Sequence, residues 1–278
     1  MLVTSIIIPN YNGGRMLREC IRSIQTHTHL PHEIIVVDNG SSDKSVSYCL
    51  KKKIRVVRLP KKTGFPTACN AGIKIASGES ILLLNNDTLV TKEWLDRMLA
   101  CLNHDPKTGI VGPMSNYANG EQQISEPFTC LEEITAKMNE PNPLKWKEVN
   151  RIVGLCMLIK RELVEKIGLL DERFSPGHYE DDDYCYRALL AGFNLKIAGD
   201  VFIFHHGSAS FKKYGEKYIR RLLDRNRKLF MEKWVMDPIV LTQKGTLFRN
   251  AKTEGGMPHT QDKEGDRKDE RSSLSLGE

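Results

Sequence analysis

The segment Ile81-Leu82-Leu83-Leu84-Asn85-Asn86-Asp87-Thr88 decides the fold class of this chain. Four apolar residues stop abruptly at two amides and a carboxylate, a pattern that indicates a buried strand of an α/β sheet. Such sheets bind ligands just beyond the carboxyl ends of their strands. We therefore expect Asp87 to lie where a ligand or a metal ion binds, although an Asx residue here could also cap the next helix.

Strand and helix patterns alternate over about the first 115 residues. This alternation indicates βαβ units, so the predicted fold class is α/β with a mostly parallel central sheet flanked by helices. The sequence predicts strands at 3–8, 33–38, 54–59, 80–84 and from 110, and helical faces at 17–24, 65–76 and 95–102.

The second half of the chain is less regular. Residues 116–150 hold few apolar runs, which predicts a long loop region with one short helix. From about residue 253 large apolar residues nearly vanish, which predicts a disordered tail over 253–278. Between these regions we expect strands at 151–159, 195–198 and 201–204, and helices at 160–167, from residue 180, and at 212–234, the last one basic and amphipathic.

The composition fits a protein with a sizeable core and no nucleic-acid partner. The 278 residues are 40% hydrophobic and carry a net charge of +6, with cations gathered at 51–53, 61–62 and 212–233. Such clusters can serve nucleic acid, anionic lipid or phosphorylated substrates, but no nucleic-acid motif accompanies them. A solvated surface is therefore the simplest interpretation of each cluster.

The cysteines and the chain start predict a cytoplasmic protein. Seven cysteines without a C-x-x-C pair indicate buried free thiols in a reducing compartment, and argue against a zinc site. The chain enters a strand directly, without the pattern of a signal peptide, and its apolar runs are far too short to span a bilayer.

Three further groups of side chains are candidates for chemistry. Asp38 ends the second predicted strand and can accept a hydrogen bond from a ring N–H or a ribose hydroxyl, or serve as a turn residue. Glu180 to Asp183 form a run of four acids, which could supply a general base or merely an acidic first helical turn. His205 and His206 end an apolar strand, where a metal ligand or a structural histidine both fit.

The motifs and their order along the chain resemble those of glycosyltransferase family 2, the inverting enzymes of the GT-A fold. The likeness includes the rhamnosyltransferase-like bacterial members of this family. The likeness runs over roughly residues 3–235. It rests on Ser5 to Asn12 as the opening strand and loop, Ile34 to Asp43 as the nucleotide-binding turn, Gly64-Phe65 with Asn70-Ala71-Gly72, Asn85-Asn86-Asp87 in the place of the D-x-D motif, Glu180-Asp181-x-Asp183 as the E-D motif, and the late His205 to Ser210 segment.

The resemblance implies a single GT-A (Rossmann-like) domain. Residues 1–115 would form its nucleotide-sugar-binding half and 116–235 its acceptor-binding and catalytic half, followed by a C-terminal extension at 236–252. The implied reaction transfers a sugar from a UDP- or dTDP-sugar to a hydroxyl of a glycan, lipid-linked or protein acceptor, as in cell-surface polysaccharide biosynthesis.

The resemblance also implies roles for individual residues. Asp38 would read the N3–H of uracil or thymine, and Asp181 would be the general base. Asp87 would hold Mn²⁺ or Mg²⁺ on the diphosphate, with His205 as a further ligand. The residues implied for donor binding are Pro9, Tyr11, Asp38, Gly64, Asn70, Asn85 and Asn86.

Two positions depart from the family pattern. Asn85 stands where many relatives carry Asp, and the lower ligand charge should weaken metal binding. Lys62 stands where an Asn is usual, and a cation there could approach the diphosphate.

Two alternative functions stay open at this point. A nucleotidyltransferase would also begin with a strand and a nucleotide loop, although the segment from Asn10 to Arg15 is a poor match to its Gly-rich loop. A non-catalytic nucleotide-sugar-binding module is favoured by Asn85.

The basic helix at 212–234 also has two interpretations. It could rest on anionic lipid and bring the protein, as a peripheral component at the inner face of the membrane, to a lipid-linked acceptor. Alternatively, its apolar face packs on the core. We expect acceptor choice to reside in this helix and in residues 116–150.

Overall fold

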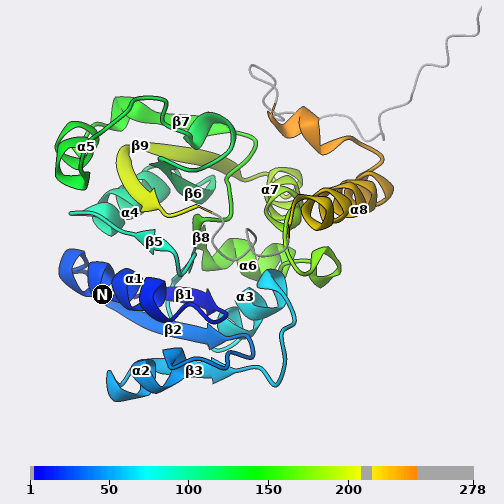
Figure 1. Cartoon of the computed structure of the whole chain (residues 1–278). Coiled ribbons are helices and arrows are strands. Elements are labelled where there is room, and N and C mark those ends of the chain that lie inside the picture. The colour runs from blue at the N-terminus through cyan, green and yellow to red at the C-terminus, as the bar shows by residue number, and fades with distance from the viewer. Residues whose placement is uncertain (1–2, 208–214, 243–278) are drawn as a thin grey trace, which may run out of the picture.

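The apolar run Ser80–Leu84 forms strand β4, which is buried throughout and lies inside the sheet, as its sequence predicts. The computed structural model describes residues 3–207 and 215–242, and within them one nine-stranded sheet has the order β3-β2-β1-β4-β8-β6-β9-β5, with β7 paired to β9 (Figure 1). The strands are β1 (Thr4–Asn10), β2 (His32–Asp38), β3 (Arg55–Arg58), β4, β5 (Thr88–Leu89), β6 (Thr108–Ser115), β7 (Trp146–Val149), β8 (Cys156–Lys160) and β9 (Asn194–His205).

Helices cover both faces of this sheet. Alternate residues of each central strand point to opposite faces, so Ile6 and Ile8 contact one hydrophobic cluster and Ile7 the other. The first cluster includes side chains of α1, α2 and α4, and the second those of α3, α6 and α7. The helices are α1 (Gly14–His27), α2 (Ser45–Lys51), α3 (Phe65–Ile73), α4 (Trp94–His104), α5 (Leu131–Met138), α6 (Arg161–Ile167), α7 (Glu180–Leu190) and α8 (Glu216–Trp234), with 3-10 turns η1 (Gly120–Gln122), η2 (Pro143–Lys145), η3 (Glu172–Phe174) and η5 (Pro238–Thr242).

The predicted α/β fold is confirmed, but the sheet is mixed. β3, β2, β1 and β4 are parallel, as the βαβ pattern predicts. β8 then joins antiparallel to both β4 and β6, and β9 pairs antiparallel with β5 and β7. The alternation that enforces parallel crossovers stops near residue 115, so pairing beyond it follows other connections.

The prediction of a strand over 151–159 was wrong in its first half. Only Cys156–Lys160 is a strand, and residues 151–155 form a loop. The loop amides are satisfied by side chains instead of a ladder: Val153 N donates to Gln122 Oε1 at 2.7 Å and Gly154 N to Asp181 Oδ2 at 2.9 Å. Its apolar residues are therefore buried without strand pairing.

The two predicted strands at 195–198 and 201–204 are one strand, β9. Its pairing with β6 shifts between Pro113 and Met114, which face Ala198 and Phe202 and leave a bulge at 199–201. Residues 116–150 contain α5 as predicted, and also β7, which the polar composition did not indicate.

Some predictions lie outside the described residues. They are the disordered tail at 253–278, most of the extension at 236–252 and the first residues of the basic helix, whose described part begins at Glu216.

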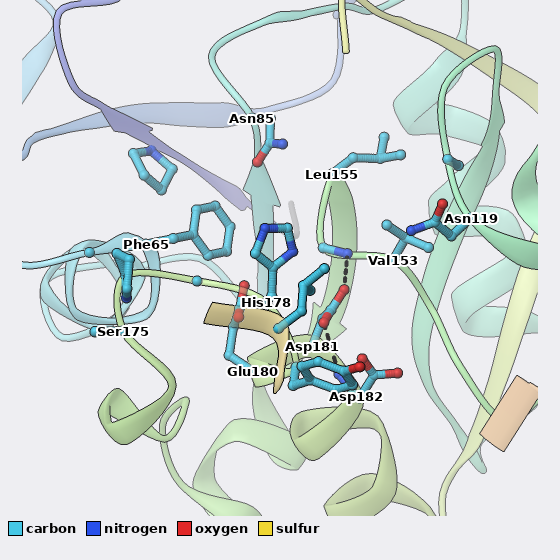
Figure 2. Close-up of a pocket in the computed structure, with 18 of the residues that line it drawn as sticks. Phe65, Asn85, Asn119, Val153, Leu155, Ser175, His178, Glu180, Asp181 and Asp182 are labelled. Carbon is cyan, nitrogen blue, oxygen red and sulfur yellow. Dashed lines mark hydrogen bonds between the residues drawn. The ribbon is translucent and has the colours of Figure 1, made fainter. Parts of the chain in front are cut away.

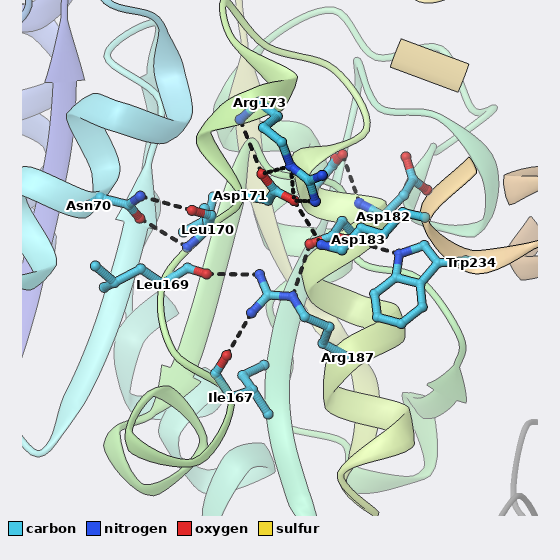
Figure 3. A network of polar contacts seen from close by, with 12 residues as sticks. Asn70, Ile167, Leu169, Leu170, Asp171, Arg173, Asp182, Asp183, Arg187 and Trp234 are labelled. Atoms are coloured by element: carbon cyan, nitrogen blue, oxygen red, sulfur yellow. Dashed lines mark hydrogen bonds and ion pairs between the residues drawn. The ribbon is translucent and has the colours of Figure 1, made fainter. Parts of the chain in front are cut away.

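A buried ionic network joins α7 to α8 (Figure 3). The fully buried Asp183 accepts hydrogen bonds from Arg187 Nε at 2.9 Å, Lys233 Nζ at 2.6 Å and Trp234 Nε1 at 2.9 Å. Lys233 also forms an ion pair with Asp171. Hydrogen bonds from Arg173, and next from Lys233, lower the pKa of the Asp171 carboxyl. Asp183 is thus a structural acid that anchors α8 against α7.

Candidate active site

A cavity of about 870 Å³ opens where the parallel strands end. One wall comes from residues that follow β1, β2 and β4, and the facing wall comes from the start of α7 and the loop at 151–155 (Figure 2). A third wall comes from α8 and η5, through Tyr218, Leu223, Arg227, Pro238 and Ile239. The cavity thus joins both halves of the chain.

Pro9 and Tyr11 line the cavity at the end of β1. Lys62 Nζ lies 4.0 Å from the centroid of the Tyr11 ring, in cation–π contact. The unusual lysine of the glycine loop therefore contributes positive charge to this wall.

Asp38 ends β2 but does not line the cavity. Its side chain is buried, and Oδ1 accepts a hydrogen bond from Ser41 N at 3.2 Å. The next residue, Asn39, lines the cavity instead, and its Oδ1 accepts from Thr63 N at 2.8 Å. Asn39 therefore shapes the glycine loop, a role that the sequence analysis missed.

Asn70 lies away from the cavity and ties two segments together. Its amide donates to Leu170 O at 2.9 Å and accepts from Leu170 N at 3.0 Å, as Figure 3 shows. It also donates to Glu172 Oε1 at 2.9 Å. Asn70 is thus a buried structural residue and is not among the residues that line the cavity.

The amides that follow β4 have separate surroundings. Asn86 donates to Asn10 Oδ1 at 2.8 Å and so links the ends of β4 and β1. Asn85 is half-buried and lines the cavity, where Figure 2 shows its side chain. Both amides line the cavity next to Asp87.

Asp87 and His205 meet because β5 pairs with β9. Thr88 lies opposite His205 in this antiparallel pair, which places His205 Nε2 3.2 Å from Asp87 Oδ1. His205 Nδ1 lies 2.8 Å from the Tyr117 carbonyl oxygen, which only accepts, so Nδ1 carries a proton. The other ring nitrogen, directed at the carboxylate, is then the one suited to ligate a metal ion.

Asp181 is held by two backbone amides. Its Oδ2 accepts from Gly154 N at 2.9 Å and its Oδ1 from Asp182 N at 3.0 Å. Figure 2 shows the first of these bonds, beside Val153 and Leu155. Each carboxylate oxygen has a second acceptor position, so these bonds orient the group without exhausting it.

Glu180 is a buried acid in a different state. It is 5% exposed, and Oε2 has no hydrogen-bond partner among the described residues. Burial, and next the Asp181 carboxylate, raise the pKa of Glu180 well above its usual value and so favour its protonated form. A neutral carboxyl in the cavity can both donate to and accept from a hydroxyl group.

Arg151 balances the remaining acids. It forms an ion pair with Asp182, and its guanidinium lies 3.9 Å from Asp181 Oδ2. Burial alone would lower the pKa of Arg151, but the Asp182 and Asp181 carboxylates outweigh that effect and raise it. The sequence marks Arg151 only as the start of an apolar run, so no pattern identified this cation.

Gly64 allows two walls of the cavity to approach each other. Its φ is +113°, and a Cβ there would lie 2.8 Å from Pro176 Cα. Phe65 N also donates to Pro176 O at 3.0 Å. The glycine loop therefore packs directly on the turn that leads into Glu180 and Asp181.

Comparison with protein families identifies the class of this molecule. Residues 5–168 match the family described as Glycosyl transferase family 2. The chain belongs to glycosyltransferase family 2 and is a glycosyltransferase. Neither a nucleotidyltransferase nor a non-catalytic module is supported by this assignment.

Curated relatives agree with the family assignment. "Glycosyltransferase GlyG" of Streptococcus pneumoniae is 27% identical over 75% of this chain and 72% of its own length. "Low-salt glycan biosynthesis hexosyltransferase Agl10" of Haloferax volcanii is 28% identical over 80% of this chain and 73% of its own.

Solved structures show the same GT-A fold. A structure of GalNAc-T7 with UDP, GalNAc and Mn²⁺ superposes with a TM-score of 0.60 at 18% identity, covering 74% of this chain and 44% of that chain. Mannosyltransferase PcManGT from Pyrobaculum calidifontis, in complex with GDP-Man and Mn²⁺, gives 0.56 at 19% identity, covering 73% and 56%. This chain therefore spans about half the length of the solved relatives.

Among residues 3–207 and 215–242, no helix combines the length and the apolar character that crossing a bilayer requires.

We predict that Glu180→Gln makes stability less dependent on pH. Because the folded-state pKa of Glu180 lies above the unfolded value near 4.5, the folded protein binds this proton more tightly, and wild-type stability falls as pH rises through that interval. Glutamine mimics the protonated acid. The free energy of unfolding of the variant, relative to that of wild type, should therefore rise by up to about 1.4 kcal/mol per pH unit above pH 4.5.

Urea denaturation at several pH values from 5 to 8 measures this difference. The matched control is Glu165→Gln, which changes an exposed glutamate on α6. A wild-type minus variant difference that stays constant with pH would show that Glu180 is ionised in the folded protein.

Proposed function

We propose that this protein transfers a sugar from a UDP- or dTDP-sugar to a hydroxyl of an acceptor, with inversion at the anomeric carbon. The observation that carries the proposal is that the Asp87–His205 pair and the Asp181 carboxylate line one cavity at the carboxyl edge of the sheet. Solved relatives were captured with UDP, UDP-GlcNAc or GDP-Man, which supports a nucleotide-sugar donor.

The donor base would lie against the ends of β1 and β2. Pro9 and Tyr11 supply an apolar and aromatic surface there, and Asp38 is the acceptor that a uracil or thymine N3–H requires. Because Asp38 is buried behind the cavity wall, the base would have to reach it past Asn39. Gly64 and Lys62 would approach the diphosphate.

Asp87 and His205 would hold Mn²⁺ or Mg²⁺. The two side chains supply one oxygen and one nitrogen ligand at a 3.2 Å separation, and the donor diphosphate can supply further oxygens. When bound, such a cation neutralises charge on the leaving diphosphate. The described residues hold no cluster of three ligating side chains, so the fit depends on a bound donor.

Asp181 would act as the general base. Its carboxylate takes the proton of the acceptor hydroxyl while that oxygen attacks the anomeric carbon from the face opposite the diphosphate. The bond from carbon to diphosphate breaks as the new glycosidic bond forms, so one base suffices and no covalent nucleophile is needed. The amides of Gly154 and Asp182 orient the carboxylate for this transfer.

The acceptor would lie between the start of α7 and the wall formed by α8 and η5. This wall offers Tyr218 and Ile239, both partly exposed, beside the Arg227–Asp237 ion pair. Tyr117, Ala118 and Asn119 line the cavity from the 116–150 segment. A glycan, lipid-linked or protein acceptor is compatible with these surfaces, and the curated relative Agl10 is named for glycan biosynthesis.

The donor and metal assignments predict a specific pattern of thermal stabilisation. UDP or dTDP should raise the melting temperature more than GDP or CDP, and Mn²⁺ should increase the shift, because ligands that bind only the folded state stabilise it by mass action. At a concentration about 100-fold above Kd the gain is about 2.7 kcal/mol. Asp87→Asn should remove the Mn²⁺ increment while keeping a shift with nucleotide alone.

Glu132→Gln, on the exposed face of α5, is the control for this screen. No shift with any of the four nucleotides would contradict the proposed donor. A Mn²⁺ increment that survives in both Asp87→Asn and His205→Gln would contradict the metal assignment.

The base assignment predicts that Asp181→Asn loses transfer but keeps donor binding. Release of nucleoside diphosphate from a panel of UDP- and dTDP-sugars should fall by roughly 100-fold to 10,000-fold, the usual contribution of a positioned general base. The nucleotide-dependent thermal shift should be unchanged. Asp224→Asn, an exposed acid on α8, serves as control, and full activity of Asp181→Asn would exclude it as the base.

A peripheral membrane contact of α8 is also part of the proposal. Lys217, Arg221 and Lys228 are exposed on this helix, and each cation near an anionic surface contributes about 1 kcal/mol. Replacing the three by Gln should abolish flotation with anionic vesicles. The charge-matched control replaces the exposed Lys51, Lys52 and Lys53 by Gln. Equal flotation of wild type and both variants would contradict a membrane contact through α8. Absence of flotation for wild type would contradict it as well.

A further inference from the structure

The turn from Phe174 to Tyr179 leads directly into Glu180 and Asp181. Its conformation depends on contacts with other parts of the chain. His178 and Tyr179 both have positive φ, 74° and 71°, which side chains other than glycine rarely adopt. Tyr179 is the N-cap of α7, so the backbone conformation of this turn sets the positions of Glu180 and Asp181 in the first turn of the helix. Residues in such conformations persist only when their surroundings over-determine them.

Asn226 of α8 supplies this support. Its side chain is fully buried, and Nδ2 lies within hydrogen-bond distance of the carbonyls of Phe174, Gly177 and His178 at 2.8, 2.9 and 2.8 Å. An amide has two hydrogens, so three carbonyls share them. One side chain therefore holds three carbonyls of the turn at a single point of the helix.

The same turn is held on its other side by the glycine loop. Pro176 O accepts from Phe65 N at 3.0 Å, and Gly64 packs on Pro176. Arg225, next to Asn226, adds contacts from its guanidinium to the carbonyls of Arg173 and Ser175, both at 2.7 Å. The turn is thus fixed between α8 and the loop beside the donor half of the cavity.

We infer that Asn226 is a positioning residue, which sets the Asp181 carboxylate relative to the donor through the turn 174–179. The inference rests on the proposed role of Asp181 as base. α8 lies beyond the matched family segment at 5–168, so this support comes from a part of the chain to which the family match assigns nothing. Asn226 itself does not line the cavity.

The expected result for Asn226→Ala is a split between catalysis and donor binding. The turnover number should fall by roughly 10-fold to 100-fold, since small misplacements of a reacting group have effects of this size. The donor KM and the nucleotide-dependent thermal shift should stay within about twofold, because Pro9 and Tyr11 lie at the end of β1 and Asp87 lies between β4 and β5. The pH dependence of turnover should also shift, because the base is displaced.

Two further variants separate positioning from general destabilisation. Leu222→Ala removes a buried side chain one helical turn away and should lower stability without the change in pH profile. Arg225→Ala removes an exposed side chain, so it should fold normally, and should lower turnover by a smaller factor of roughly threefold with the same split.

The outcomes distinguish this inference from the function on which it rests. If Asp181→Asn is inactive while Asn226→Ala and Arg225→Ala turn over like wild type, the positioning role is overturned and the base assignment stands. If Asn226→Ala does not fold, unchanged turnover in Arg225→Ala overturns the role. If Leu222→Ala reproduces the pH shift, the effect is one of stability, and the role is overturned as well.

Discussion

The pairing of β5 with β9 is the contact on which the site depends. β5 contains only Thr88 and Leu89, yet its pairing with β9 places Asp87 beside His205. A strand of two residues cannot hold two buried ionisable groups by its own ladder. Rigidity comes from the rest of β9, which pairs with β6 on one side and with β7 over its first half. His206 N also donates to Asp87 O at 2.9 Å.

The acids of the cavity coexist because each has a different environment. Burial raises the pKa of Glu180 and favours its neutral form, Asp181 accepts from two backbone amides, and Asp182 is paired with Arg151. Three adjacent carboxylates ionised together without such partners would repel one another strongly in a buried site. Asp183, the fourth member, faces away into the network with Lys233 and carries no part of the cavity. One acidic run thus supplies several distinct groups.

The sequence predicted those features that depend on local patterns. β4, β1 and β2 follow from short apolar runs, and α7 begins at its acidic residue as expected. β9 was predicted as two strands because Gly199 and Asp200 look like a break. In the structure, contacts with residues distant in the sequence stabilise this part of β9. Asp200 accepts hydrogen bonds from Trp146 Nε1 at 2.8 Å and from Asn142 N at 3.0 Å, each more than 50 residues away along the chain. No periodicity reports such contacts. The sequence gives one weak indication of Asn226: it is a polar residue four positions from both Leu222 and Phe230, on the buried face of the helix.

The two sides of the cavity are held by different kinds of contact. The proposed donor side follows directly from main-chain ladders, since Pro9 lies within β1 and Asn39 and Asn85 directly follow β2 and β4. The opposite side, at α8 and η5, is attached through side chains, chiefly Asn226, Arg225 and the Asp183 network. Removing a strand ladder would disrupt the fold, whereas a single side-chain hydrogen bond contributes about 1 kcal/mol. Substitutions in α8 can therefore reshape the proposed acceptor wall while the donor side keeps its geometry.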